Sequence, residues 1–261
     1  MIIKLDSSYH NKVIKYLEKE EEFNLLTIGD IERYGYDNYF LNIWAGINIK
    51  GDIEGVLVKC FEFIIFYAYD QFNVDEFADL ISNMEFTEIS GKSNVVDLLA
   101  YKLNIVRRRK VKFCKLESKE LFKYDDLNIK VKKMRFIHLN KVAKLYEAIE
   151  EFENTTVENL RNGLKTGRGY FIEQDKHIVA MAKSTSENKN YAMIVGVGTH
   201  PKYRNRGLAT KCIVKICSEL LDENKIPCLF YDNEKAGEIY HKLGFENIGD
   251  WSIYQRNHNQ V

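Results

Sequence analysis

The sequence reads, from residue 197 to residue 209, Val-Gly-Thr-His-Pro-Lys-Tyr-Arg-Asn-Arg-Gly-Leu-Ala. An apolar pattern typical of a strand ends at Thr199, and the pattern of an amphipathic helix begins at Gly207. The first turn of a helix offers unpaired N–H groups and the positive end of the helix dipole. Gly207 lets a phosphate approach the backbone closely, and Arg204 and Arg206 add positive charge. The stretch therefore predicts an anion site suited to a pyrophosphate; the alternative interpretation is a capped helix with solvated arginines.

The same stretch resembles the pyrophosphate loop of the GNAT superfamily of N-acyltransferases. The pattern that carries the resemblance is Arg204-x-x-Gly207-x-Ala209, preceded by Thr199-x-Pro201-x-x-Arg204. A later stretch is similar to the other signature of that superfamily: Asn233-x-x-Ala236-x-x-x-Tyr240-x-x-Leu243-Gly244-Phe245. The lead-in Val-Gly-Val-x-Thr-x-Pro, from residue 195, most resembles the branch near glycine N-acyltransferase-like proteins. Residues 129–254 carry the resemblance.

The resemblance implies where acetyl-CoA, the co-substrate of this superfamily, would bind. It would lie in a V-shaped split between two parallel strands, here the strand ending at Thr199 and the strand Cys228–Tyr231. The pantetheine arm would pair with the backbone of the first strand, and the pyrophosphate would rest on the N–H groups at the start of the next helix. Thr210 would add a hydroxyl, and Asn233 would hydrogen-bond the cofactor arm. The residues at the matching positions are Val197, Gly198, Thr199, Arg204, Asn205, Arg206, Gly207, Leu208, Ala209, Thr210 and Asn233.

Tyr240 matches the position of the general acid in the second signature. The implied reaction is the attack of an amine on a thioester, with a thiolate as leaving group. A thiol with a pKa of about 8.5 is a fair leaving group, and a tyrosine with a pKa of about 10 can protonate it. A backbone N–H of the split strand could polarise the thioester carbonyl. The alternative interpretation of Tyr240 is a core aromatic residue on an amphipathic helix.

The general base is not identified by the sequence. Many members of the superfamily carry Glu or Asp on the strand that matches Tyr191–Thr199, but here that stretch contains no carboxylate. A water held by the backbone, or a residue elsewhere such as Glu151 or Glu173, are the alternatives. His200 adjoins the loop and is expected at the surface beyond the strand.

The two halves of the chain show the same predicted order of elements: two helices, three strands, then helix, strand, helix and strand. We therefore expect an α/β (α+β) protein of tandem GNAT-like folds, each a mixed, mainly antiparallel sheet flanked by helices. The expected boundaries are 1–120 for a degenerate N-terminal domain and 128–261 for the acetyl-CoA-binding catalytic domain. In the first half, Tyr69 is followed by Asp-Gln-Phe-Asn, without glycine or arginine. We expect that half to have lost cofactor binding.

The composition limits the classes of partner. The chain has 261 residues, 45% of them hydrophobic, and 38 basic residues balance 38 acidic ones, so that the net charge is +0. This balance gives no reason to expect nucleic acid or a membrane as the main partner. The cysteines and histidines show no metal-type spacing, and Met1–His10 has no signal-peptide pattern. We expect a soluble cytoplasmic protein that uses no metal, with a homodimer as one expected assembly.

These observations predict an acetyl-CoA-dependent N-acetyltransferase that moves an acetyl group to a primary amine by direct attack, with Tyr240 as general acid. The acceptor is expected to be a small molecule or a peptide amine. Acceptor pockets in this superfamily share no common motif, so the sequence does not narrow the choice further. Two alternatives stay open: a non-catalytic acyl-CoA-binding sensor, and an acyltransferase that uses longer acyl-CoA or acyl-carrier-protein donors.

Overall fold

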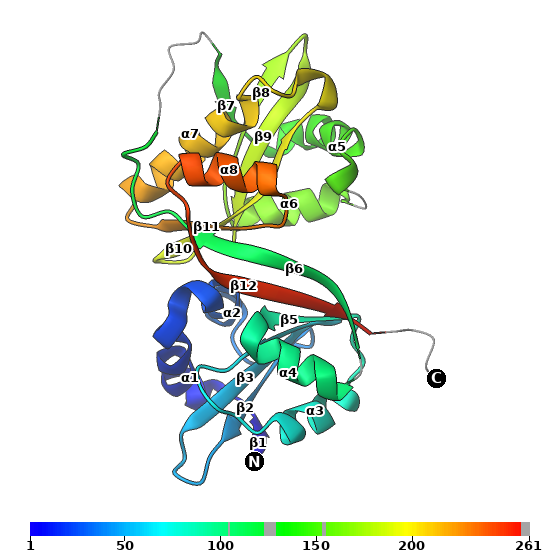
Figure 1. Ribbon diagram of the computed structural model, residues 1–261, viewed down its shortest axis with the longest axis vertical. Helices are drawn as coiled ribbons and strands as arrows, with labels where there is room; N and C mark the ends of the chain where they lie inside the picture. The colour runs from blue at the N-terminus through cyan, green and yellow to red at the C-terminus, as the bar shows by residue number, and fades with distance from the viewer. Residues whose placement is uncertain (104, 123–128, 153–154, 257–261) are drawn as a thin grey trace. The chain divides into compact units, whose positions relative to one another are not determined.

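The structure is a computed structural model that describes residues 1–103, 105–122, 129–152 and 155–256. The chain forms two compact units (Figure 1). Unit 1 contains Met1–Phe113 and the described residues from Ile248 on, and unit 2 contains Cys114–Asn247. These units differ from the expected ranges 1–120 and 128–261 chiefly at the end of the chain, where the last strand belongs to unit 1.

Unit 1 is built around a mixed sheet with strand order β1-β2-β3-β4-β5-β12-β6. Neighbouring strands are antiparallel from β1 to β4 and between β5 and β12, whereas β4 and β5 are parallel. Its elements are β1 (Ile2–Lys4), α1 (His10–Leu17), α2 (Glu21–Tyr34), β2 (Leu41–Ile47), β3 (Ile53–Cys60), β4 (Phe63–Tyr67), α3 (Val74–Ser82), β5 (Glu88–Lys92), α4 (Ser93–Leu103), most of β6 (Val106–Lys115) and most of β12 (Glu246–Gln255).

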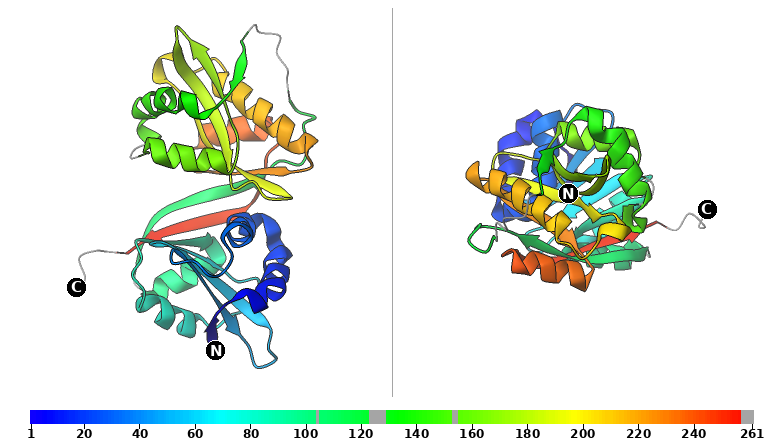
Figure 2. Two further views of the ribbon diagram at one scale, coloured as in Figure 1. Left: turned by 180° about the vertical axis from the view of Figure 1, so that it is seen from behind. Right: turned by 90° about the horizontal axis from the view of Figure 1, so that it is seen from above.

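Two helix pairs cover the two faces of the unit 1 sheet (Figures 1 and 2). Helices α3 and α4 bury Phe77 and Leu99 against Phe66 of β4 in one apolar cluster. Helices α1 and α2 cover the other face with buried residues such as Leu17 and Ile28. The spacing of these apolar residues matches the helical period, so that burial of one stripe fixes each helix on the sheet.

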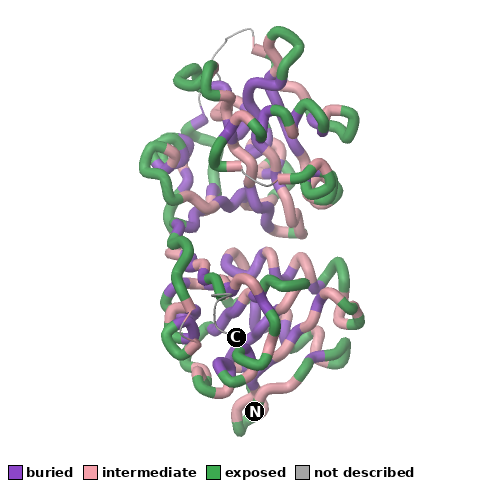
Figure 3. Tube along the Cα trace, turned by 90° about the vertical axis from the view of Figure 1, so that its right-hand side faces the viewer, coloured by how far each residue is buried: buried purple, intermediate pink, exposed green. Residues whose placement is uncertain are grey.

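Unit 2 repeats this arrangement with strand order β7-β8-β9-β10-β11, antiparallel except for the parallel pair β10–β11. Helices α7 and α8 cover one face and α5 and α6 the other. Its elements are β7 (Val131–Lys133), α5 (Leu139–Glu147), α6 (Val157–Lys165), β8 (Gly169–Gln174), β9 (His177–Thr185), β10 (Tyr191–Thr199), α7 (Leu208–Asp222), β11 (Ile226–Tyr231) and α8 (Glu234–Lys242). Figure 3 shows buried and exposed segments in both units; buried residues predominate in strands such as β3 and β9, whereas the first half of β6 is exposed.

The expected fold class is confirmed, because each unit has a mixed, mainly antiparallel sheet flanked by helices. Strand β12, within the expected domain 128–261, pairs antiparallel with β5 of unit 1. There Ser252 lies 2.8 Å from Ser93, hydroxyl to hydroxyl, and Tyr254 donates a hydrogen bond to Asp97. Helices α1 and α2 are separated by a 3-10 turn over Glu18–Glu20.

Candidate functional site

The parallel strands β10 and β11 separate part of the way along their length. Their register runs from the pair Tyr191–Ile226 to the pair Ile194–Leu229, although β10 continues to Thr199 and β11 to Tyr231. Residues 192–194 and 227–229 of the paired part are buried, whereas residues 195–197 and 230–231 beyond it are half-buried. Backbone groups of the free end of β10 are therefore available to a ligand, as a split strand pair requires.

A β-bulge turns β10 at the start of its free end. The register of β10 against β9 shifts between Val195 and Gly198. Gly196 has a φ of +59°, and an added Cβ there would collide with the Tyr146 hydroxyl. An added Cβ at Gly198 would lie 2.6 Å from the ring of Phe152. Glycine is required at both positions, because α5 and the segment after it pack directly on the bulge.

The segment after β10 leads into α7 with its first N–H groups free. Gly207 precedes the helix in the left-handed conformation, with a φ of +65°, and no side chain caps the helix. The first backbone bond across the turn runs from the N–H of Lys211 to the carbonyl of Gly207, so the N–H groups of residues 208–210 have no acceptor within the helix. No atom lies within 4 Å of an added Cβ at Gly207, so the approach is open.

The two arginines of the predicted loop have different environments. The Arg204 guanidinium donates a hydrogen bond to the Thr199 carbonyl at 3.3 Å and lies 3.5 Å from a carboxylate oxygen of Glu151. Arg206 lies over the ring of Tyr203 at 5.5 Å. Both are exposed, and both keep donor groups that an anionic ligand can use.

The structure brings most of the predicted cofactor-binding residues together. The free end of β10 carries Val197, Gly198 and Thr199, and it leads directly into the loop and the first turn of α7, which contain Arg204, Asn205, Arg206, Gly207, Leu208, Ala209 and Thr210. Asn233 follows β11, where its side-chain oxygen accepts from the N–H of Lys235 and caps α8. The Asn233 amide nitrogen has no such role in the cap. The side chain of Leu208 is in the core, so only its N–H can serve a ligand.

Tyr240 lies on the face of α8 that packs against the sheet. Its ring centroid is 5.8 Å from those of Tyr231 and Phe245, and 8% of the residue is exposed. Burial raises the pKa of Tyr240 to about 12. The Tyr240 ring therefore packs as a core aromatic residue. Its hydroxyl stays protonated at neutral pH, as a proton donor requires.

The two carboxylates considered as general base are engaged elsewhere. Glu173 accepts hydrogen bonds from Lys132 and Lys141, each at 2.6 Å, and these lower its pKa to about 2. Glu151 lies beside Arg204, as described above. A carboxylate with so low a pKa is a weak base, so Glu173 is a poor proton acceptor for an amine. Sequence reasoning did not identify Tyr146 and Lys183, which surround the bulge; the glycines at 196 and 198 were the only signal for them.

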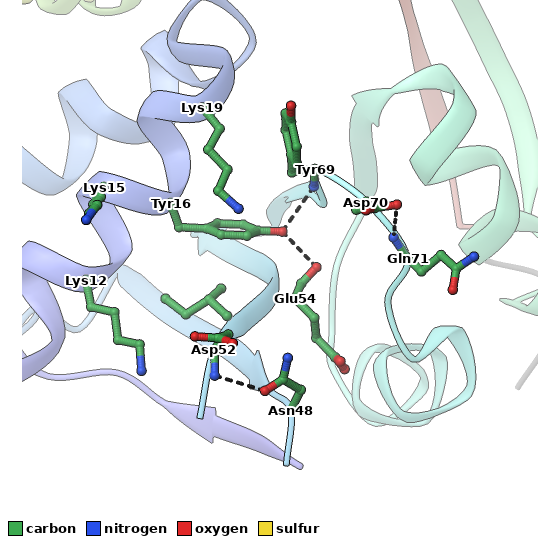
Figure 4. Close-up of a pocket in the computed structure, with 11 residues that line it drawn as sticks. Lys12, Lys15, Tyr16, Lys19, Asn48, Asp52, Glu54, Tyr69, Asp70 and Gln71 are labelled. Carbon is green, nitrogen blue, oxygen red and sulfur yellow. Dashed lines mark hydrogen bonds between the residues drawn. The ribbon is translucent and has the colours of Figure 1, made fainter. Parts of the chain in front are cut away.

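Unit 1 has a pocket whose place in the fold differs from that of the β10–β11 split in unit 2 (Figure 4). The pocket has a volume of about 780 Å³ and lies between α1 and the end of β4. The Tyr16 hydroxyl donates to the Glu54 carbonyl at 2.7 Å and accepts from the N–H of Tyr69 at 3.0 Å. The polar lining includes Lys12 and Lys15 of α1, Lys19 after that helix, and the carboxylates Asp52, Glu54 and Asp70.

The described residues contain neither a membrane-spanning helix nor a cluster of metal ligands. No helix in that part of the chain is long and apolar enough to cross a membrane. Within the same residues, no group of three or more His, Cys, Asp or Glu side chains could hold a metal ion.

Solved structures resemble the chain over nearly its full length. A Drosophila protein matches with a TM-score of 0.72 at 12% identity and covers 98% of both chains. A GCN5-related N-acetyltransferase from Sphaerobacter thermophilus matches with a TM-score of 0.66 at 12% identity, covering 98% of this chain and 95% of that one. A tandem GNAT protein from the clavulanic acid biosynthesis pathway matches with a TM-score of 0.64 at 12% identity and covers 98% of both chains. At such identities the likeness shows the fold alone, here a tandem GNAT fold.

A search of curated proteins found no match. The model of the GNAT acetyltransferase family matches residues 60–254, which is more than half of the chain and includes all of β10, α7, β11 and α8. The family supports an acyl-CoA-dependent acetyltransferase in general terms, whereas the glycine N-acyltransferase-like branch stays a prediction. The chain belongs to the GNAT acetyltransferase family.

Proposed function

We propose that unit 2 transfers an acetyl group from acetyl-CoA to a primary amine at the split between β10 and β11. The observation that carries this proposal is the combination of a parted parallel strand pair with an uncapped helix N-terminus directly after the free strand. A split pair offers backbone groups to an extended arm, and an uncapped helix offers N–H groups to a phosphate. A capped helix with solvated arginines would need neither feature.

The residues present fit a CoA ester. The N–H groups of Leu208, Ala209 and Thr210 would bind the pyrophosphate, with the Arg204 and Arg206 guanidinium groups beside it. The backbone of Val197 and Thr199 would pair with the pantetheine arm. Any side chain at position 207 would enter the space that the pyrophosphate needs, and the open surroundings of Gly207 meet that requirement.

Tyr240 supplies the proton for the leaving group in this proposal. The neutral amine attacks the thioester carbon, the C–S bond breaks, and the Tyr240 hydroxyl donates its proton to the departing sulfur. The amine proton leaves through solvent water, which restores the tyrosine. Because burial raises the pKa of Tyr240 to about 12, the residue is in its acid form throughout the neutral range. The reaction needs no covalent enzyme intermediate.

Calorimetric titration with acetyl-CoA, free CoA and butyryl-CoA tests the proposal directly. We expect micromolar binding with a preference for acetyl-CoA, followed by acetyl transfer in a panel of primary amines. Bound ligand at about 100 times its dissociation constant should also stabilise the fold by about 2.7 kcal/mol, which gives an independent thermal check. Failure of every acyl-CoA to bind would overturn the proposal.

A non-catalytic acyl-CoA sensor is the second candidate. The observation in its favour is that β10 has no carboxylate and that Glu173 and Glu151 are held by basic side chains. Such a sensor would bind acetyl-CoA with the same dependence on Gly207. It would transfer no acetyl group to any amine, so the amine panel separates the two candidates.

A further inference from the structure

Lys183 lies beside the point where β10 leaves β11. In the β9–β10 register it is opposite Val195, the residue after the last one that pairs with β11. Alternation along β9 places it on the same face as Met181, which is the face covered by α5 and α6. The residue is half-buried, so this cation is partly removed from water inside the catalytic unit.

The Lys183 side chain crosses the bulge and ends at α6. An added Cβ at Gly196 would lie 3.2 Å from its Cε atom, and an added Cβ at Gly163 would lie 3.0 Å from its Nζ atom. The stem therefore passes over the bulge, and the ammonium group is at helix α6. Glycine inside a helix costs about 1 kcal/mol relative to alanine. The close approach of the ammonium group explains why a glycine occurs at position 163.

Within the described part of the chain, no carboxylate compensates this charge. Among the residues that the structure describes, none lies within ion-pair distance of Lys183, and desolvation lowers its pKa. A partly buried cation without an anionic partner is unfavourable in the free protein. The Tyr146 hydroxyl, a second donor, and the Lys183 stem both lie next to the position of an added Cβ at Gly196. Both groups therefore lie at the bulge, on the side of the sheet that α5 and α6 cover.

We propose that Lys183 selects acceptor amines that carry an anionic group, a carboxylate or a phosphate, on the same molecule. This inference rests on the proposed function, in which the reacting carbonyl lies at the free end of β10. The ammonium group lies beyond the bulge, at α6. It would therefore bind an anionic group that is some distance from the reacting amine. A proton acceptor would instead have its nitrogen at the bulge. An anion bound there would satisfy the ammonium that the free protein leaves unpaired.

Matched pairs of amines test this selection. The probes are 4-aminobutyrate against butylamine for a carboxylate, and 2-aminoethyl phosphate against ethylamine for a phosphate. Calorimetric binding in the presence of free CoA and acetyl transfer from acetyl-CoA are both measured. We expect the wild type to favour at least one anionic member by about tenfold or more. Lys183→Met should remove that preference, and Lys183→Arg should retain most of it because the cation is kept.

The variants also separate this inference from the proposed function. Lys183→Met should bind acetyl-CoA as the wild type does, because Lys183 lies outside the pyrophosphate loop. Equal binding of charged and neutral amines by the wild type, or a preference that survives Lys183→Met, would overturn the inference while acyl-CoA binding persists. Loss of turnover in Lys183→Arg with anion binding intact would overturn it as well, because that pattern indicates a proton acceptor. Failure of acyl-CoA binding in the wild type would instead overturn the proposed function, and the amine-binding data would still decide the role of Lys183.

Discussion

The parallel strand pair of unit 1 stays together where the corresponding pair of unit 2 separates. Strands β4 and β5 remain paired up to Phe66 and Gly91, one residue before each strand ends. An added Cβ at Gly91 would collide with the Phe66 carbonyl, which shows how closely the two backbones approach. In unit 2, β10 continues for a further stretch after its last pair with β11. The same fold therefore has a closed slot in one unit and an open slot in the other.

Helix α3, which follows β4, and helix α7, which follows β10, differ in whether a side chain caps their first turn. In unit 1, the Asn73 side chain accepts a hydrogen bond from the N–H of Glu76 and caps α3. In unit 2, Gly207 has no side chain to offer, and the first N–H groups of α7 stay free. A side-chain cap stabilises a helix by satisfying a donor that a phosphate could otherwise use. One donor at the start of α3 is thus satisfied within unit 1, whereas those at the start of α7 are free for the ligand proposed above.

Replacement of Gly207 by glutamate is expected to have the largest effect on this comparison. The carboxylate would fill the open space before α7 and repel a pyrophosphate there. We expect acetyl-CoA affinity to fall by about 100-fold or more, because several charge-assisted hydrogen bonds are lost together. Calorimetric titration measures this change.

Gly35→Glu is the matched control. Gly35 follows α2 in unit 1 with a φ of +66°, against +65° for Gly207, and an added Cβ there also has nothing within 4 Å. The backbone cost is at least as large at Gly35, because its ψ of −147° lies in a region that is nearly exclusive to glycine, whereas Gly207 has a ψ of 15°; the charge, however, is placed in the unit with the closed slot. Equal affinity in Gly207→Glu and Gly35→Glu would contradict the assignment of the pyrophosphate site to unit 2.

Tyr240→Phe should lower turnover by about 100-fold while acetyl-CoA affinity stays near the wild-type value. The variant removes only the proton that the leaving sulfur receives. Tyr254→Phe in unit 1 is the control, because Tyr254 is equally buried, at 8% exposed, and loses a hydrogen bond to Asp97. Steady-state kinetics that gave both variants the same turnover would assign Tyr240 to the core alone.

The sequence predicted the local elements well, but it did not predict which strands pair with one another. Strand β10 has the expected bounds Tyr191–Thr199, because its apolar run and the residues that flank it are unambiguous. The residues of β12 were expected in the second domain, because the local sequence of a strand does not indicate which sheet it joins. The pairing with β5 depends on contacts such as Ser93 with Ser252, which are far apart in the chain.

The candidate site shows the same limit. The loop at Arg204–Gly207 is contiguous in sequence, so its residue pattern could predict an anion site. Lys183 and Tyr146 come from β9 and α5, and only the bulge of β10 brings them together. No spacing rule connects residues on separate elements, so sequence reasoning left the acceptor side undetermined.

Asp30→Asn should stabilise unit 1 by about 2 kcal/mol at about pH 8. Burial raises the pKa of Asp30 from 3.8 to about 6. The folded state therefore binds more protons than the unfolded state between these values, so wild-type stability falls as the pH rises from about 4 to 6 and stays lowered above. Both tryptophans, Trp44 and Trp251, lie in unit 1, so their fluorescence during urea unfolding reports that unit. A gain that persists unchanged at about pH 4 would contradict this origin.

Asn73→Ala removes the side-chain cap of α3 in unit 1, and its expected effect is the smallest. Removal of the side-chain oxygen leaves the Glu76 N–H without its acceptor, and loss of such a cap costs about 1 kcal/mol. Tryptophan fluorescence should show this loss in unit 1, with acetyl-CoA affinity unchanged. The variant also frees a donor at the start of α3 without opening β4 from β5. If an uncapped helix alone were enough for acyl-CoA, Asn73→Ala would create a second binding event in the calorimetric titration. We expect one event, because the strand pair stays closed and offers no backbone to the pantetheine arm.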